Sequence, residues 1–352
     1  MRKNKVIALA LALLMMSTIG CAGGNADSAS GNQTVTASSS AAPSTSEPAA
    51  PTFPDKDMTF WIGTSTGGAN DLNARALIPG MEEVLGVRII PELLQGANGA
   101  IAAVKLQALD PNGLNLYLHS QSLLMMQYTG QSDVNIAKLQ PVAQVSEDFS
   151  AVCVPANAPY DTLEEFIEYC RQNPGKVKAG NSGNGSIWHI ASVLFANAFE
   201  LDIKMIPYDQ GGSQQTVACA AGEVDVIFNS PSEQQSLVDA GSLKQLAVLS
   251  DNRHPTIPDV PTVKEVTGVD LTFPVWRGVF TTAGVSADKL QILSDAIEYA
   301  MTTDVLVQFM ESSGTLPKFK DIKEFSEFVK NEDEVYKNVL DELGLKVSEP
   351  KA

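Results

Sequence analysis

The sequence predicts an α/β protein built from two lobes, each a mostly parallel sheet flanked by helices. Short apolar segments of strand length alternate with segments of helical periodicity along nearly the whole chain, which is the pattern of sheets with helical crossovers. Aromatic residues make up only 7% of the chain, whereas small and aliphatic residues are plentiful. The length of 352 residues is enough for two lobes of ordinary size.

The first twenty residues have the pattern of a secretory signal. Three basic residues precede an apolar run over residues 6–16, which is too short for a membrane-spanning helix. The TIGC segment that ends at Cys21 resembles the lipobox of bacterial lipoproteins, with Thr18 where leucine is preferred. This resemblance implies that Cys21 is lipidated. We therefore expect a signal peptide over 1–20, a lipidated cysteine with a flexible tether over 21–56, and an extracytoplasmic, membrane-anchored protein.

The mature chain is strongly acidic. Removing the signal segment takes away the positive charges of Arg2, Lys3 and Lys5, so the formal net charge changes from −17 to −20. Contacts with nucleic-acid phosphates require clustered lysine and arginine, and we therefore expect no nucleic-acid partner. Any anionic ligand must be held by local geometry against the field of the whole molecule.

The first lobe is expected to begin at Met58. The segment MTFWIG predicts a buried strand, and STGGANDLNAR predicts a glycine-rich turn that opens a helix over 72–85. Gly86 ends this helix, and residues 87–90 form the next strand. The segment QGANGAIAA repeats the plan of glycines leading into a helix. A DPNG turn then precedes a strand over 114–119.

The extended apolar run over 141–155 is expected to carry the chain into the second lobe, and PVWRGVF from Pro274 is expected to bring it back. The predicted lobes are therefore 57–155 plus 273–352 for the first and 156–272 for the second. The second lobe and the tail contain helices predicted over 162–171, 187–198, 214–221, 290–300, 305–310 and 322–343, and strands over 177–179, 203–208, 223–228 and 243–249. The acidic run over 332–334 is expected to be a solvated helix face.

Three cysteines remain after Cys21, namely Cys153, Cys170 and Cys219. An odd number in an oxidising compartment is more typical of buried small apolar side chains than of a disulfide framework. Their spacing does not suggest a metal site, and we expect no metal or other cofactor.

The segment AGNSGNGSIWH forms a glycine-rich turn between a strand and a helix, and the turn after the first strand has the same plan. Backbone N–H groups at a helix amino terminus can bind a carboxylate or phosphate without a basic side chain. Two such turns, one in each lobe, suit a small anion held in the crevice beyond the strand ends. The alternative is an ordinary turn with Ser186 as the N-cap.

Several segments in order resemble the solute-binding proteins of tripartite tricarboxylate transporters, also called the Bug family. They are TSTGGANDLNARALIPGMEEVLG, GANGAIAA, DPNG, NPGKVKAGNSGNGSIWH, IPYDQGG, GEVDVIF, PDVPT and WRG. The resemblance covers the chain from Met58 to Val347. It implies a periplasmic-binding-protein fold of the type with two crossovers, whose lobes close on a small organic carboxylate and dock, as a monomer, on membrane permease subunits.

The resemblance also implies which residues meet the ligand, because the family holds the carboxylate with backbone amides, small hydroxyls and waters from the two turns. The implied residues are Ser65, Thr66, Gly67, Gly68 and Asp71 in the first turn, Asn181, Ser182, Gly183, Asn184, Ser186 and His189 in the second, and Tyr208 and Asn229 after two later strands. Two places depart from the family pattern. Asp209 and Gln210 replace a basic residue and a glycine, and Arg277 stands where an aromatic residue is common.

Some of these positions have a second interpretation. His189 can face the ligand or be a packed histidine that donates to a carbonyl. Arg277 can hold a second carboxylate or be an arginine at the hinge surface. Asp71 is expected to cap its helix and orient the loop, because an ionised aspartate would repel a ligand carboxylate. Trp188 and Trp276 are expected in the wall and core.

Two other functions are weighed against solute binding. A hydrolase is suggested by GNSGN, but Asn184 replaces the last glycine of the nucleophile-elbow pattern. His119 at a strand end leaves a Ser182–His pair open. A ligand-sensing protein that serves a signalling partner would have the same binding lobes. We expect a solute-binding protein and no enzymatic activity.

Overall fold

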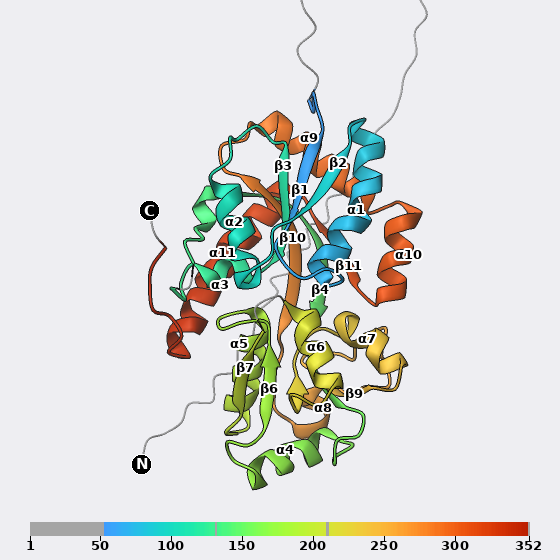
Figure 1. Ribbon diagram of the computed structural model, residues 1–352, viewed down its shortest axis with the longest axis vertical. Coiled ribbons are helices and arrows are strands. Elements are labelled where there is room, and N and C mark those ends of the chain that lie inside the picture. Colours follow the sequence, from blue (N-terminus) through green and yellow to red (C-terminus); the bar gives the residue numbers. More distant parts are fainter. Residues whose placement is uncertain (1–52, 131, 209–210, 351–352) are drawn as a thin grey trace, which may run out of the picture.

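The computed structural model describes residues 53–130, 132–208 and 211–350. These residues form two lobes stacked along the long axis of the molecule, and each lobe contains one sheet (Figure 1). The predicted two-lobed α/β fold is therefore confirmed. Among the described residues, no helix is both long and apolar enough to span a membrane. Cys21 and the expected signal and tether lie outside the described residues, except for the last few tether positions.

The first lobe contains a six-stranded sheet in the order β11-β4-β10-β3-β1-β2. Its strands are β1 (Met58–Ile62), β2 (Ile89–Leu93), β3 (Asn115–Ser120), β4 (Leu139–Phe149), β10 (Pro274–Thr282) and β11 (Leu316–Lys320). Strand β1 runs parallel to β2 and β3, whereas β10 runs antiparallel to β3 and β4, and β11 antiparallel to β4. The sheet is mixed rather than mostly parallel, because the two long strands that connect the lobes run in opposite directions.

Helices cover both faces of this sheet (Figure 1). One face packs against α1 (Ala69–Leu85), α9 (Ala287–Ala300) and α10 (Asp304–Ser313). The other packs against α2 (Ala100–Gln107), α3 (Ser122–Met126) and α11 (Ile322–Glu342). Two short 3₁₀ turns, η1 (Ala97–Gly99) and η2 (Ile136–Lys138), precede α2 and β4.

The second lobe contains a five-stranded sheet in the order β7-β6-β8-β5-β9. Its strands are β5 (Ala151–Pro155), β6 (Lys178–Asn181), β7 (Lys204–Pro207), β8 (Val226–Ile227) and β9 (Leu243–Val248). This sheet is also mixed, since β6 is parallel to β7 and β8 whereas β5 is antiparallel to β8 and β9. Its helices are α4 (Leu163–Gln172), α5 (Ile187–Ala198), α6 (Gly212–Ala220), α7 (Pro231–Asp239) and α8 (Val263–Thr267).

The first crossing between the lobes lies at Ser150, not near Pro155 as the sequence predicted. Strand β4 ends at Phe149 in the first sheet, and β5 begins at Ala151 in the second. Both strands are buried and apolar and one residue separates them, so hydropathy gives no boundary. The return crossing lies between Phe273 and β10.

The two crossings are joined by a short backbone ladder at the hinge. The Ser150 N–H donates to the Phe273 carbonyl at 3.1 Å, and the Phe273 N–H donates to the Leu249 carbonyl at 2.8 Å. The Leu249 N–H completes the set by donating to the Ser150 carbonyl at 2.8 Å. The two crossings and the end of β9 (Leu243–Val248) are therefore hydrogen-bonded neighbours at the hinge.

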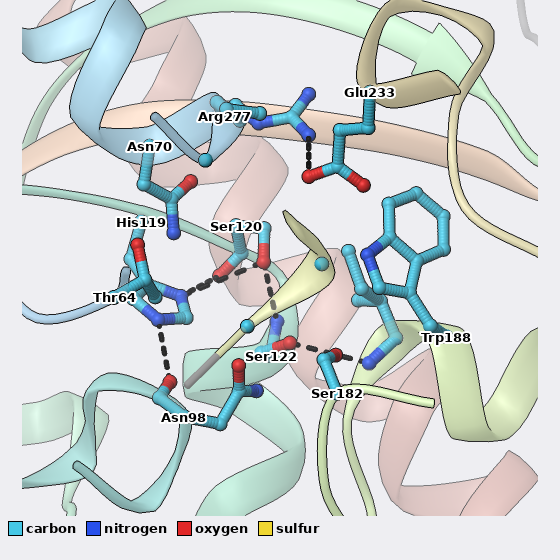
Figure 2. A pocket seen from close by; sticks show the side chains of 15 residues that line it. Thr64, Asn70, Asn98, His119, Ser120, Ser122, Ser182, Trp188, Glu233 and Arg277 are labelled. Atoms are coloured by element: carbon cyan, nitrogen blue, oxygen red, sulfur yellow. Dashed lines mark hydrogen bonds and ion pairs between the residues drawn. The ribbon is translucent and has the colours of Figure 1, made fainter. Parts of the chain in front are cut away.

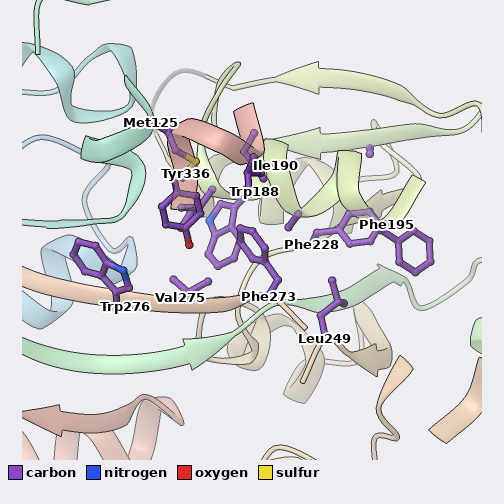
Figure 3. Close-up of a cluster of buried hydrophobic side chains, with 14 of the residues drawn as sticks. Met125, Trp188, Ile190, Phe195, Phe228, Leu249, Phe273, Val275, Trp276 and Tyr336 are labelled. Carbon is purple, nitrogen blue, oxygen red and sulfur yellow. The ribbon is translucent and has the colours of Figure 1, made fainter. Parts of the chain in front are cut away.

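Aromatic side chains from both lobes form one continuous buried cluster across this hinge (Figure 3). Trp188 and Phe273 enter it from the second lobe, and Trp276 from β10 of the first. The Trp276 Nε1–H donates to the Glu332 carboxylate at 3.1 Å. The acidic run of α11 is a solvated face only at Glu334: Glu332 is buried, and Asp333 accepts from the Tyr128 hydroxyl at 2.9 Å.

Two strands differ from the sequence-based expectation. Strand β8 covers only two residues, and the Glu223 N–H before it bonds back to the end of α6 at the Ala218 carbonyl. Strand β11 was not predicted, since Pro317 interrupts its apolar pattern and it lies at the sheet edge. Cys153, Cys170 and Cys219 are free and buried, as expected.

Candidate functional site

A narrow cavity of about 330 Å³ of empty space lies between the lobes, at the ends of the helices that follow β1 and β6. Both lobes contribute to its wall (Figure 2). The first lobe supplies Thr64, Gly68, Ala69, Asn70, Asn98, His119, Ser120, Ser122 and Arg277, and the second supplies Ser182, Ile187, Trp188, Gly211, Gly212 and Glu233.

The loop after β1 is shaped by Asp71. The buried Asp71 carboxylate accepts from the Gly67 N–H at 2.9 Å and from Arg75 Nε at 2.6 Å, so it orients the loop and lies outside the cavity. Thr66 is exposed and also lies outside it. The Ser65 hydroxyl instead contacts the Ser213 hydroxyl of the opposite lobe. Of the positions implied for this turn, Gly68 lines the cavity.

The turn after β6 is fixed by its own side chains. The Asn181 Oδ1 accepts from the Gly183 N–H at 3.0 Å, and the Ser186 Oγ caps α5 by accepting from the His189 N–H at 3.3 Å. The His189 Nδ1 accepts from the Gly185 N–H at 3.0 Å, and burial lowers the pKa of this ring. His189 is therefore a packed histidine that orders the turn.

Only one implied position of this second turn, Ser182, lines the cavity. Gly183, Asn184 and Ser186 line a neighbouring cavity of about 610 Å³, which shares Asn98 with the first. The first backbone N–H of α5 makes a hydrogen bond between the lobes: the Ile187 N–H donates to the Ser122 Oγ at 3.2 Å.

Tyr208 and Asn229 lie away from the cavity wall. Tyr208 packs against the small cluster around Cys153 and Val224. Asn229 is fully buried, and its Nδ2 donates to the Thr216 Oγ1 at 2.6 Å while its Oδ1 accepts from Gln234 at 3.1 Å. Asn229 therefore holds side chains behind the site, and its hydrogen bond to Glu233 lowers the pKa of that carboxyl group against the larger effect of burial.

Arg277 is buried, with 1% of its surface exposed, so it is not an arginine of the hinge surface. It lies on β10. The Gln121 side chain holds this strand by donating to the Pro274 carbonyl at 2.8 Å and accepting from the Trp276 N–H at 3.0 Å. Its Nη2 lies 3.6 Å from the Oε1 of Glu233, which belongs to the opposite lobe (Figure 2). Among the described residues, its Nε and Nη1 have no hydrogen-bond partner.

Glu233 is the charged residue of the site that the sequence-based reasoning missed. It lies in the first turn of α7, and burial raises the pKa of its carboxyl group while Arg277 opposes that shift. Its Oε2 is buried with no hydrogen-bond partner among the described residues. The signal in the sequence was Pro231, which starts a helix directly after β8 and so places Glu233 at the same sheet edge as Asn229.

His119 and Asn98 form another part of the wall that was not assigned to ligand binding. The His119 Nε2 donates to the Asn98 carbonyl at 2.9 Å, and its Nδ1 accepts from the Ser120 hydroxyl at 3.5 Å. Burial lowers the pKa of His119 to about 4, so the ring is neutral near pH 7. Both ring nitrogens are engaged by the first lobe, and this geometry does not form the Ser182–His pair of a hydrolase.

Several buried polar atoms around the cavity have no hydrogen-bond partner among the described residues. In residues of the wall they are Thr64 Oγ1, Glu233 Oε2, and Arg277 Nε and Nη1. Unpaired buried polar atoms are rare in folded proteins and are costly, so their gathering at one cavity indicates a polar ligand. In the same part of the chain, no group of His, Cys, Asp or Glu side chains could hold a metal ion.

Comparison with known proteins places the chain in a family. The model of the tripartite tricarboxylate transporter family receptor matches residues 73–345. A UPF0065 protein of Bordetella pertussis is 28% identical over 298 residues, which cover 84% of this chain and 92% of that protein. A solved periplasmic transporter is 26% identical with a TM-score of 0.79, over 84% of this chain and 100% of that one.

A second solved structure has the same fold at lower identity. MatC of Rhodopseudomonas palustris with bound malate is 22% identical, with a TM-score of 0.76 over 82% of this chain and 100% of that one. The family match over most of the chain agrees with the two lobes, the paired crossings and the cavity between the lobes. The protein belongs to the tripartite tricarboxylate transporter receptor family, the solute-binding proteins that the sequence resembled.

Proposed function

We propose that this protein captures a small organic carboxylate between its lobes and delivers it to the permease subunits of a tripartite tricarboxylate transporter. The observation that carries the proposal is Arg277, a buried cation with two unpaired nitrogens on an interlobe cavity. A buried guanidinium with open donors is a strong site for a carboxylate. In a chain as acidic as this one, such a local arrangement is needed to hold an anion.

The small hydroxyl and amide groups opposite Arg277 complete the proposed site. Ser122 and Ser182 present hydroxyls from the two lobes, and Asn98 presents its side-chain amide from half-buried η1 (Figure 2). Gly68 brings the backbone at the start of α1 to the wall without a side chain in the way. MatC, which shares the fold, holds malate, and this supports a carboxylate as the ligand class.

The other residues implied by the family resemblance are proposed to act indirectly, by fixing the conformation of the loops that face the ligand. Asp71, Asn181, Ser186 and His189 each bond to backbone N–H groups of a turn, so they fix the atoms that face the ligand. Ser65 is proposed to join the lobes when they close, through Ser213. The remaining implied positions, Thr66, Gly67, Gly183, Asn184, Tyr208 and Asn229, are proposed to shape the surroundings of the site.

We also propose where in the cell the protein acts and how it is held there. We infer an extracytoplasmic protein that is held at the membrane by lipid on Cys21 and acts as a monomer. The family match supports the location outside the cytoplasm, and the TIGC segment supports the lipid. Closure about the hinge at Ser150, Leu249 and Phe273 would present the loaded form to the permease.

A ligand screen tests the proposed function. The mature protein is mixed with di- and tricarboxylates, amino acids and aromatic acids, and its thermal unfolding is followed. A ligand at a hundred times its dissociation constant adds about 2.7 kcal/mol of stability. We expect at least one carboxylate to raise the unfolding temperature of the wild type and to lose this effect in Arg277→Gln. If no carboxylate of any class stabilises the wild type, the proposed function is wrong.

A further inference from the structure

The cavity contains one charge of each sign among the residues that the structure describes. Arg277 contributes the positive charge from β10, and Glu233 contributes the negative charge from α7. No other charged residue belongs to the described wall. Burial raises the pKa of Glu233 and Arg277 opposes this shift, with smaller opposing effects from hydrogen bonds of Asn229 and the Ala69 backbone and a smaller raising effect from Asp148. The described wall of the cavity is therefore balanced in charge rather than positive.

The two charged side chains do not satisfy each other. Their closest atoms, Arg277 Nη2 and Glu233 Oε1, are 3.6 Å apart, which is longer than the roughly 2.7–2.9 Å typical of a charge-assisted hydrogen bond. Arg277 keeps Nε and Nη1 unpaired, and Glu233 keeps Oε2 unpaired, although both side chains are almost fully buried. The cavity therefore offers open donors on one side and an open carboxylate oxygen on the other.

Glu233 also lies against the backbone of its own lobe. A Cβ placed on Gly212 would be 2.5 Å from one carboxylate oxygen of Glu233 and 2.7 Å from the other. This close approach leaves the carboxylate little freedom to turn away from Arg277. A ligand that enters the cavity therefore meets both charges.

We infer that the ligand of this cavity is a zwitterionic amino acid, whose carboxylate binds Arg277 and whose ammonium group binds Glu233. This inference rests on the proposed function and narrows its ligand class. A zwitterion leaves the buried site electrically neutral and gives every open atom of the pair a partner of opposite sign. A dicarboxylate would satisfy Arg277 but place its second carboxylate near Glu233, and an uncompensated buried charge is strongly disfavoured.

The alternative role of the pair is a latch that only holds the lobes together, since Arg277 and Glu233 belong to opposite lobes. A latch would contribute equally to the binding of every ligand that closes the protein. A charge partner for the ligand would instead discriminate between ligands that differ in charge at one end. Matched ligands therefore separate the two roles.

The experiment is isothermal titration of the mature protein with ligand pairs that differ at one end only. The pairs are glycine and malonate, β-alanine and succinate, and 4-aminobutanoate and glutarate, with the common L-amino acids added to cover other side chains. Each is titrated into wild type, Glu233→Gln and Asp239→Asn. The last variant removes one negative charge from an exposed position of the same helix.

In wild type we expect the tightest zwitterion to bind at least tenfold more tightly than any of the three dicarboxylates. In Glu233→Gln we expect that preference to shrink by tenfold or more, because the ammonium loses its partner and the repulsion of a second carboxylate is removed. Asp239→Asn should keep the wild-type order. The double variant Arg277→Gln/Glu233→Gln, which leaves no unpaired buried charge, should fold and bind neither class tightly.

A tightest ligand that lacks an amino group overturns the inference and leaves the proposed function intact. An equal effect of Glu233→Gln on both members of each pair assigns Glu233 to the latch and also overturns it. Binding of no carboxylate at all contradicts the proposed function itself, so the two failures are distinguishable. Thermal unfolding of each variant without ligand checks that the fold is retained.

Discussion

The Asp148 carboxylate and the His254 ring lie 3.1 Å apart, between Oδ1 and Nε2, and both side chains are fully buried beside the hinge. Asp148 belongs to β4 of the first lobe, whereas His254 belongs to the second lobe after β9. The other oxygen of Asp148 accepts from the Ser232 Oγ at 2.9 Å. One buried carboxylate thus ties a crossing strand to two separate parts of the second lobe.

Replacing Asp148 tests how much this tie stabilises the protein. In Asp148→Asn one oxygen becomes an NH₂ group, so the side chain can no longer accept from both Ser232 and His254. Leaving one buried polar group unpaired costs about 1–3 kcal/mol of the free energy of unfolding. Urea denaturation should show this loss, whereas Asp239→Asn at an exposed position should stay within about 0.5 kcal/mol of wild type. Equal stability of the two variants would contradict the role given to Asp148.

Ser182 and Ser186 lie in one turn but are expected to affect different quantities. Ser182 lines the cavity, and loss of one neutral hydrogen bond to the ligand in Ser182→Ala should weaken affinity about three- to tenfold. Ser186 caps α5, so Ser186→Ala should lower the free energy of unfolding by about 1 kcal/mol and leave affinity within about twofold of wild type. Titration calorimetry and urea denaturation of both variants measure the two effects. The reverse pattern would place the ligand at Ser186.

Gly99 and Gly67 both have positive φ, of 94° and 77°, but only one is crowded. A Cβ on Gly99 would lie 2.5 Å from His119 Nε2 and from the Tyr117 hydroxyl, whereas a Cβ on Gly67 meets no atom within 4 Å. Gly67→Ala should therefore cost only the backbone strain, about 1 kcal/mol. Gly99→Ala should cost more than about 2 kcal/mol, because overpacking adds to the strain and the His119 ring must also move. Similar losses in the two variants would show that the wall at His119 is not tightly packed.

His119 should make the stability of the protein depend on pH. Burial lowers the pKa of His119 to about 4, below its ordinary value of 6.5. Between these values the unfolded chain binds a proton that the folded protein does not, so the free energy of unfolding falls as pH drops from about 6.5 to about 4. At about 1.36 kcal/mol per pH unit the full loss is about 3 kcal/mol.

The variant His119→Gln isolates this effect, because its amide keeps a donor for the Asn98 carbonyl but does not titrate. Urea denaturation of wild type and variant at several pH values between about 4 and about 7 gives the difference between them, in which the contributions of other groups cancel. We expect wild type to lose stability relative to the variant as pH falls. A difference that is constant across this range would show that His119 does not titrate as the burial of its ring implies.

The anchor is tested separately from the binding lobes. In Cys21→Ser the TIGC segment loses the thiol that would carry the lipid, so the protein should leave the membrane fraction or remain unprocessed. Ligand affinity of the variant should equal that of the wild type, since Cys21 lies far before the first strand in the sequence, which begins at Met58. Fractionation and the mass of the mature protein measure the outcome. Unchanged mass and membrane association would exclude lipidation at Cys21.

Local patterns in the sequence were enough to predict most elements. The alternation of strands and helices indicated the two-lobed α/β fold, and the glycine-rich turns after β1 and β6 marked the strand ends that meet at the cavity. Relationships between distant segments could not be derived in this way. The antiparallel crossing strands and the boundary at Ser150 depend on pairing with β10 and β9, which the pattern of one segment does not contain.

In the candidate site, too, local features could be predicted from the sequence, whereas contacts between distant segments could not. The two turns were assigned, but which of their atoms face the cavity depends on side chains such as Asp71 and His189 that turn inward to bond the loop itself. Arg277 was noticed because it departs from the family pattern. Glu233 was missed because nothing near it in the chain reveals that α7 meets β10 across the interlobe cavity.

The aromatic cluster that crosses the hinge has a consequence for how the protein melts. The second lobe is an insertion between β4 and β10, and its Trp188 and Phe273 share one apolar cluster with Trp276 and Phe325 of the first lobe. Separating the lobes would expose large aromatic surfaces on both. We therefore expect the two lobes to form a single cooperative unit in calorimetry, with one heat-capacity peak, even though the proposed closure moves one lobe relative to the other.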